Sequence, residues 1–194
     1  MRIGVLALQG DVREHIQALE DCGALAIPVK TAAEISAIDA LVLPGGESTT
    51  IAKLAHSFGL FDLIQQRITD GLPVYGSCAG MILLANKIVG GAVDQETFGG
   101  MDLTVRRNAF GRQVDSFEAN LKMEHVGEVR AIFIRAPWVE VASPQVEVLA
   151  QVSIEGVNHP VAVRQGRLLA TSFHPELTGD YRVHRYFVSE VCRH

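Results

Sequence analysis

A cysteine between two glycines is the residue best placed to act as a nucleophile. Cys78 lies in the run Gly76–Gly80, after the apolar segment Leu72–Tyr75 and before a helical pattern. Glycines permit the sharp strand-to-helix turn that projects such a side chain above a sheet, and the helix dipole favours its thiolate. The alternative interpretation is a small buried cysteine in a turn. We expect Cys78 to attack carbonyl carbon, whereas Cys22 and Cys192 lack this context and are interpreted as structural or incidental.

A histidine near the end of the chain is the best candidate for the acid that protonates a departing amide nitrogen. His174 follows the strand-like segment Leu168–Thr171, and Glu176 lies two residues further on. Pro175 disfavours a helical conformation at His174, and the Glu176 carboxylate can fix the tautomer of the imidazole. The spacing predicts a Cys78–His174–Glu176 triad, although a histidine that satisfies a local polar need is equally compatible with spacing alone. That second interpretation is given to His15, His56, His125, His159, His184 and His194.

A glycine-rich loop, Pro44–Thr50, follows a buried strand pattern and opens a helix, so its backbone N–H groups are unpaired. The N–H groups of Gly46 and Ala79 are candidate donors to the oxyanion that forms when Cys78 attacks a carbonyl. An ordinary glycine turn with a capping serine is the alternative. A phosphate-binding loop is not supported, because the sequence contains no G-x-x-x-x-G-K-[ST] run and no G-x-G-x-x-G after its first strand.

Alternating strand and helix patterns in the first half of the chain must position these groups. The strand-like segments are Ile3–Leu8, Ala26–Val29, Ala40–Leu43 and Leu72–Tyr75, and helices are expected from Val12, over Ile51–Phe58 and Phe61–Thr69, and from about Met81. We expect Asp11 to cap the first helix and Gly23 to end it. This alternation predicts a parallel sheet with helices on both faces, and such a sheet presents its chemistry at the carboxyl ends of its strands.

Beyond Gly90 the pattern changes to short strand-like segments separated by turns. They are Leu103–Val105, Phe117–Leu121, Ala131–Ile134, Val146–Val152, Pro160–Val163 and Leu168–Ser172. We expect them to continue the sheet as antiparallel additions, and we expect Tyr181–Val191 to close the chain as an amphipathic helix. Without an internal repeat or linker, residues 1–194 are expected to form one α/β domain.

Composition excludes several classes of protein. The chain has 194 residues, 48% of them hydrophobic, and a net charge of −5, and it contains no dense basic run that would bind nucleic acid. Its three cysteines form no zinc-binding pattern, so we expect neither a metal nor an organic cofactor. No segment approaches the roughly 20 apolar residues of a membrane span, and we expect a cytoplasmic location.

Three of these motifs, Gly76–Gly80, Pro44–Glu47 and His174–Glu176, together resemble the class I glutamine amidotransferases. Longer motifs resemble, more narrowly, the glutaminase subunits of two-component pyridoxal 5'-phosphate synthases. These are Leu8–His15, Leu43–Thr50, Arg107–Phe117, Phe133–Pro137 and Ser172–Thr178. The resemblance covers nearly the whole chain. Two departures are a Gly91–Gly100 stretch that looks longer than in relatives and a serine at Ser77, where threonine is common.

The resemblance implies a flavodoxin-like, mixed and mostly parallel sheet, and it implies hydrolysis of L-glutamine through a γ-glutamyl thioester on Cys78 with the His174–Glu176 pair. It also implies a set of glutamine-binding residues, which are Gly46, Glu47, Ser48, Arg107, Ile134 and Arg135. Without the resemblance, Arg107 and Arg135 are interpreted as solvated surface charges.

The implied partner is a (β/α)8-barrel synthase subunit that uses the ammonia, with ribose 5-phosphate and glyceraldehyde 3-phosphate, to build pyridoxal 5'-phosphate, commonly in a 12 + 12 assembly. Pyridoxal 5'-phosphate is then a product of the complex and not a cofactor of this chain.

Three other functions remain open. The chain could be another cysteine hydrolase on the same sheet, a binding module with an incidental thiol, or a glutaminase that supplies ammonia for tryptophan, histidine, purine or GTP synthesis. The His-Pro-Glu placement and the glycine-rich loop argue against the first function, and the activity of a Cys78→Ala variant would test the second. Only the longer motifs argue against the third.

Overall fold

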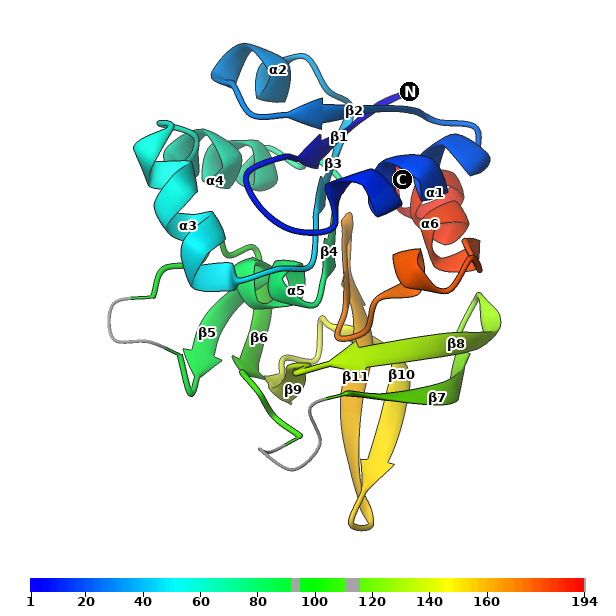
Figure 1. The fold of residues 1–194 in the computed structure, drawn as a ribbon. Helices are drawn as coiled ribbons and strands as arrows, with labels where there is room; N and C mark the ends of the chain where they lie inside the picture. Colours follow the sequence, from blue (N-terminus) through cyan, green and yellow to red (C-terminus); the bar gives the residue numbers. More distant parts are fainter. Residues whose placement is uncertain (92–94, 111–115, 194) are drawn as a thin grey trace.

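A central seven-stranded sheet runs through the computed structural model, which describes residues 1–91, 95–110 and 116–193 (Figure 1). In spatial order its strands are β10 (Glu147–Ile154), β11 (Val157–Gln165), β12 (Leu168–Thr171), β4 (Val74–Ser77), β3 (Ala40–Leu43), β1 (Arg2–Leu6) and β2 (Leu25–Val29). The five strands from β12 to β2 are parallel, whereas β11 and β10 are added antiparallel. The parallel part has the flavodoxin-like order, which confirms the predicted fold class.

Helices cover both faces of this sheet. The α-helices of the described residues are α1 (Val12–Asp21), α2 (Ala32–Ser36), α3 (Ser48–Ser57), α4 (Phe61–Thr69), α5 (Ala79–Leu84) and α6 (Arg182–Tyr186), and α6 is followed by the π-helical turn η2 (Phe187–Val191). One buried cluster contains apolar side chains of α2, α3, α4 and α5, and the other contains those of α1, α6 and η2. None of the described helices combines the length and apolarity that crossing a membrane requires.

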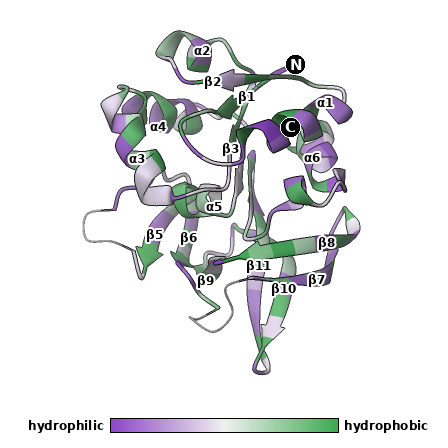
Figure 2. Ribbon diagram, viewed as in Figure 1, coloured by the Kyte–Doolittle hydropathy of each residue, from purple (hydrophilic) through white to green (hydrophobic). Residues whose placement is uncertain are grey.

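Strand β3 shows why the centre of the sheet forms here. All four of its residues are fully buried, and alternate side chains enter opposite cores: Leu41 and Leu43 pack in one cluster and Ala40 and Val42 in the other. A strand of this composition is stable only where both faces are covered. In Figure 2 the central strands are accordingly hydrophobic, whereas α1 and α3 mix hydrophilic and hydrophobic residues.

The segments after α5 only partly follow the prediction. Strands β10 and β11 extend the central sheet as antiparallel additions, as expected. The expectation is wrong for Leu168–Ser172, because β12 pairs parallel with β4 inside that sheet. The remaining strands form a three-stranded sheet and a hairpin of their own: β5 (Ala85–Val89), β6 (Met101–Arg106) and β9 (Trp138–Ala142), then β7 (Ser116–Met123) and β8 (Gly127–Ile134). In β6 and β8, burial alternates along the strand, so each has one apolar face. Such strands pack that face onto a core and leave the other toward solvent.

Several boundaries differ from the sequence-based expectation. The strand leading to Cys78 reaches Ser77, two residues further than predicted, and the following helix gives way to β5 at Ala85. The final helix becomes π-helical after Tyr186. Strand β9 and the short helix α2 were not predicted. Residues 92–94 of the Gly91–Gly100 stretch, residues 111–115 of the Arg107–Phe117 motif and His194 lie outside the described residues.

Candidate active site

Cys78 lies on a sharp turn between β4 and α5, as the motif predicts. Its backbone has φ 49° and ψ −97°, a conformation that places it between the strand and the first residue of the helix. A Cβ on Gly76 would lie 2.5 Å from the backbone of Gly80, and one on Gly80 would lie 2.3 Å from the carbonyl oxygen of Leu43. Both positions therefore require glycine, because strand and helix approach too closely for a side chain.

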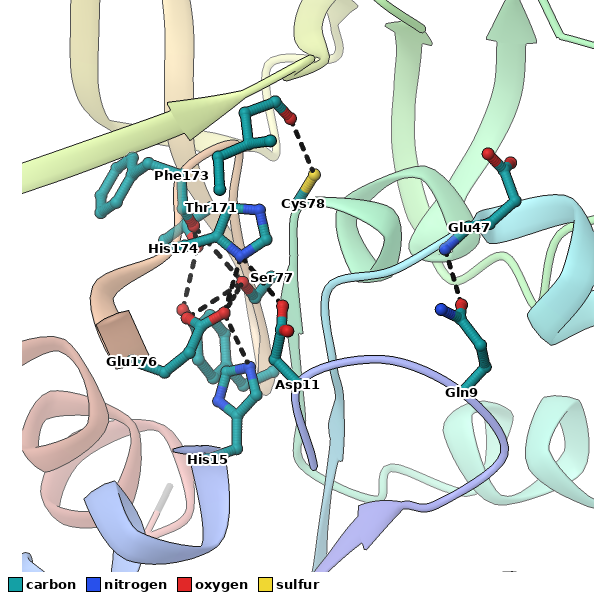
Figure 3. A network of polar contacts seen from close by, with 12 residues as sticks. Gln9, Asp11, His15, Glu47, Ser77, Cys78, Thr171, Phe173, His174 and Glu176 are labelled. Carbon is teal, nitrogen blue, oxygen red and sulfur yellow. Dashed lines mark hydrogen bonds and ion pairs between the residues drawn. The ribbon is translucent and has the colours of Figure 1, made fainter. Parts of the chain in front are cut away.

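The predicted triad residues meet at this turn. His174 follows β12, and its Nδ1 lies 2.7 Å from Oε1 of Glu176, which belongs to the short 3-10 helix η1 (Pro175–Leu177). The Cys78 side chain lies beside this imidazole (Figure 3) and contributes to raising the pKa of His174. The side chain of Glu176 is fully buried, so the carboxylate acts on the histidine and not on solvent.

Charge is concentrated around the imidazole. Burial alone would lower the pKa of His174, but hydrogen bonds to Asp11, Cys78 and Glu176 outweigh it, so the pKa of His174 is raised. Burial would raise the pKa of Glu176, but His15 and His174 outweigh it and hold the pKa of that carboxyl below its usual range. The site therefore favours an imidazolium held by a carboxylate beside the cysteine, which suits a thiolate nucleophile.

Two residues that sequence reasoning assigned elsewhere belong to this network. Asp11 occupies the N-cap position of α1 but makes no side-chain cap hydrogen bond, because its carboxylate turns toward His174, with Oδ2 3.4 Å from Nδ1. His15, interpreted as locally structural, places Nε2 3.4 Å from Oε1 of Glu176. Both lie in the Leu8–His15 motif, the one sequence signal that pointed to them.

The contacts of Ser77 show how a serine can replace the threonine that is common at this position in the family. Its hydroxyl lies 3.4 and 3.3 Å from the two carboxylate oxygens of Glu176 and 3.4 Å from the carbonyl oxygen of Phe173. The serine thus keeps the hydroxyl donor that a threonine would supply.

A cavity of about 330 Å³ opens in front of Cys78 and His174. It is lined by all six predicted glutamine-binding residues, together with residues that were not predicted to bind glutamine, namely Gln9, Asp11, Ile82 and Asn108. Ile134 also turns its carbonyl oxygen toward Cys78, 4.0 Å from the sulfur. Ala79 and Glu176 do not line the cavity: Ala79 begins α5 behind Cys78, and Glu176 lies behind the imidazole.

Arg107 and Glu47, which have opposite charges, form an ion pair in the lining of the cavity. Nη2 of Arg107 lies 2.7 Å from Oε1 of Glu47, and Nη1 lies 2.7 Å from Oε1 of Gln95, which also donates to Ser48 Oγ at 2.8 Å. The side chain of Arg107 is only 13% exposed, so the interpretation of a solvated surface charge is wrong for this residue. Arg135, in contrast, is exposed while it lines the cavity.

The glycine-rich loop is held by the turn after β1. Oε1 of Gln9 accepts a hydrogen bond of 2.7 Å from the backbone N–H of Glu47 (Figure 3), and a Cβ on Gly46 would lie 2.5 Å from the same oxygen. Gly46 has φ +153°, which favours glycine. The loop therefore packs directly on Gln9 beside the cavity.

Asp11, His174 and Glu176 are also close enough to be considered as metal ligands. One ligand atom from each lies within 4.8 Å of the other two. The Nδ1 atom of His174 is already hydrogen-bonded to Glu176 at 2.7 Å, however, so the histidine nitrogen in this set serves the carboxylate.

Comparisons with known proteins show the family of the chain. The model of the SNO glutamine amidotransferase family matches residues 5–193. The pyridoxal 5'-phosphate synthase subunit PdxT of Kineococcus radiotolerans is 61% identical over 194 residues, covering 97% of this chain and 94% of the relative, and that of Streptomyces coelicolor is 61% identical over 191 residues, covering 97% and 93%.

Solved structures show the same fold. A crystal structure of a glutamine amidotransferase has a TM-score of 0.89 and 49% identity, with 98% of each chain covered. PurLQS from Thermotoga maritima has a TM-score of 0.66 over 96% of each chain at 16% identity, a likeness of fold alone.

Proposed function

Because the chain belongs to the SNO glutamine amidotransferase family, we propose that it hydrolyses L-glutamine to L-glutamate and ammonia as the glutaminase subunit of a pyridoxal 5'-phosphate synthase. The observation that carries this proposal is the Cys78–His174–Glu176 network on the wall of a cavity that also presents Arg107 and Glu47. A thiol nucleophile and a charged recognition pair are what hydrolysis of an amino-acid amide requires.

In the proposed reaction, the Cys78 thiolate attacks the side-chain amide carbon of glutamine. The N–H groups of Gly46 and Ala79 stabilise the oxyanion, and His174 protonates the departing ammonia. Water then hydrolyses the γ-glutamyl thioester with His174 as base, and the thiolate is regenerated. Glu176 keeps the imidazole oriented through both steps, because its carboxylate accepts the Nδ1 proton.

Glutamine recognition is assigned to the cavity wall opposite the sulfur. The guanidinium of Arg107 suits the α-carboxylate and the carboxylate of Glu47 suits the α-amino group, since each pairs with the opposite charge of the zwitterion. Gly46, Ser48, Ile134 and Arg135 complete the predicted set and line the same cavity. In the structure Arg107 and Glu47 pair with each other, so the bound substrate would insert between two charges that are already positioned.

The ammonia is proposed to pass to a synthase subunit, in keeping with the relatives named as subunits of pyridoxal 5'-phosphate synthase. A 12 + 12 assembly is the expected stoichiometry. We place the reaction in the cytoplasm, where a reducing environment keeps a nucleophilic thiol free.

The test is glutamate release from L-glutamine by the purified chain, alone and with the synthase subunit, with the Cys78→Ala variant as control. Release that requires Cys78 supports the glutaminase, and stimulation by the synthase supports the complex. Equal release by the Cys78→Ala variant would contradict the proposed nucleophile. If no release occurs with a folded and competent synthase, the assigned complex is wrong, and other amide substrates and ammonia acceptors are tested next.

A further inference from the structure

A buried chain of polar side chains continues behind the triad, on the side away from the cavity. Glu176 contacts His15 of α1, and Nδ1 of His15 lies 2.9 Å from Nε2 of His184 in α6. Both histidines are fully buried, and neither lines the cavity that holds Cys78. The chemistry proposed above uses neither of them.

The surroundings of His15 restrict where its protons can lie. Its ring packs edge-on against Tyr75 and is tilted against His184, so Glu176 is the anionic group that the structure shows facing it. Burial, followed by the charge on His15, lowers the pKa of His184 to about 3, so His184 is neutral at physiological pH. A neutral imidazole carries one donor and one acceptor nitrogen.

Two arrangements satisfy these contacts, and both place a proton on Nε2 of His15. If His184 donates from Nε2, then Nδ1 of His15 is the acceptor, and a neutral His15 must carry its proton on Nε2. If His15 instead donates from Nδ1 to His184, a bare Nε2 would point its lone pair at the Glu176 carboxylate, which is repulsive, so Nε2 must be protonated as well. His15 therefore carries a proton on Nε2, which lies at ion-pair distance, 3.4 Å, from Oε1 of Glu176 and has no hydrogen-bond partner among the described residues.

That contact bears on the triad because the same oxygen, Oε1, receives the Nδ1 proton of His174 at 2.7 Å. A fully buried carboxylate that loses one of its donors carries a desolvation penalty, and the carboxyl is then free to rotate or take up a proton. Either change would release His174 from the orientation that it needs toward Cys78.

We propose that His15 is a positioning residue of the glutaminase reaction, which holds the Glu176 carboxylate in line with His174 from behind. The inference rests on the proposed glutaminase function. Outer partners of catalytic groups typically contribute about 10–100-fold to activity, and we expect an effect of that order on kcat.

Two amide variants that differ by one methylene separate this role from simple packing. In His15→Gln, the amide reaches the position of Nε2, so its NH2 can donate to Glu176 while its oxygen accepts from His184. In His15→Asn, the amide reaches only the position of Nδ1, so the His184 contact is retained and the Glu176 contact is lost. Both variants are measured in complex with the synthase for kcat and KM of glutamate release, with melting temperatures to verify folding.

We expect His15→Asn to lower kcat by about 10–100-fold with KM for glutamine changed less than about threefold, and His15→Gln to recover most of kcat. Three results would each overturn the proposal. They are a wild-type kcat in the folded asparagine variant, an equal loss of kcat in both variants, and a change confined to KM. If the asparagine variant does not fold, a folded glutamine variant that has lost more than about tenfold in kcat would overturn it too. Failure of the wild-type complex to release glutamate would instead contradict the proposed function.

Discussion

A methyl group at Gly45 would press directly on His174, the proposed catalytic histidine. Gly45 lies in the loop after β3, and a Cβ built there would lie 2.3 Å from Cε1 and 2.9 Å from Nδ1 of His174, and 3.0 Å from Oδ2 of Asp11. Ordinary van der Waals contact begins at 3.4 Å, so either the His174 ring or the loop that contains Gly45 must move by about 1.1 Å, the difference between 3.4 and 2.3 Å. The Gly45→Ala variant therefore displaces His174 from Cys78 without removing any catalytic atom.

A misplacement of about 1 Å in a catalytic group can cost on the order of 100-fold in rate, which corresponds to about 2.7 kcal/mol in the activation free energy. We expect Gly45→Ala to lower kcat for glutamate release by this amount in the complex with the synthase. KM should change less, since the substitution removes none of the side chains proposed to bind glutamine. The assay is steady-state glutamate release at saturating glutamine.

The matched control is Gly71→Ala, at the opposite end of β4. Gly71 has φ +88° and no atom within 4 Å of an added Cβ, so this substitution strains the backbone without a clash. It should cost about 1–2 kcal/mol of unfolding free energy and leave kcat unchanged. If folded Gly45→Ala keeps kcat within about threefold of wild type, the proposed contact between this loop and His174 does not control the chemistry.

Three further substitutions test the network and the cavity. Glu176→Gln should lower kcat by about 10⁴-fold, because the imidazole loses the anion that fixes its tautomer, and NMR titration should show a lower pKa for His174. Asp11→Asn removes the second carboxylate beside Nδ1 of His174, so the pKa of His174 should fall. The imidazolium beside the Cys78 thiolate then loses its proton at lower pH. The alkaline limb of the pH profile of kcat/KM should therefore shift to lower pH. Arg107→Lys should raise KM for glutamine by about 10–100-fold with a smaller effect on kcat, because loss of a charge-assisted, two-pronged contact costs about 1.5–3 kcal/mol.

Each of these expectations has a distinct contrary result. An unchanged pH profile for Asp11→Asn would mean that its carboxylate does not act on His174. A change in kcat alone for Arg107→Lys would move this arginine from substrate binding to the chemical step. Full activity of Glu176→Gln would remove the carboxylate from the triad.

The parts of the fold that could be predicted are those in which local composition determines the outcome. Strands such as Ala40–Leu43 are apolar on both faces, and the glycines around Cys78 permit the sharp turn found there, so pattern alone predicted the sheet and the turn. Strand β5, in contrast, was not predicted, because Ala85–Val89 contains the exposed polar residues Asn86 and Lys87 and becomes a strand through its pairing with β6.

The contributions of Asp11 and His15 could not be derived from spacing. An aspartate before a helix is normally a cap, and a buried histidine normally satisfies a local need. Both side chains instead make tertiary contacts. His174 and Glu176, which lie more than 150 residues later in the chain, pack over the start of α1 and contact Asp11 and His15. Arg107 was likewise identified only through family resemblance, because its partners Glu47 and Gln95 come from other segments.

The central claim is that the reaction proceeds through an acyl group on Cys78, and hydroxylamine tests it most directly. Glutamine hydrolysis by the chain with its synthase subunit would be followed with increasing hydroxylamine, with γ-glutamyl hydroxamate and glutamate measured together. A thioester intermediate predicts hydroxamate formed at the expense of glutamate, and neither product from the Cys78→Ala variant. Glutamate release without any hydroxamate, or release that persists in Cys78→Ala, would contradict covalent catalysis by Cys78.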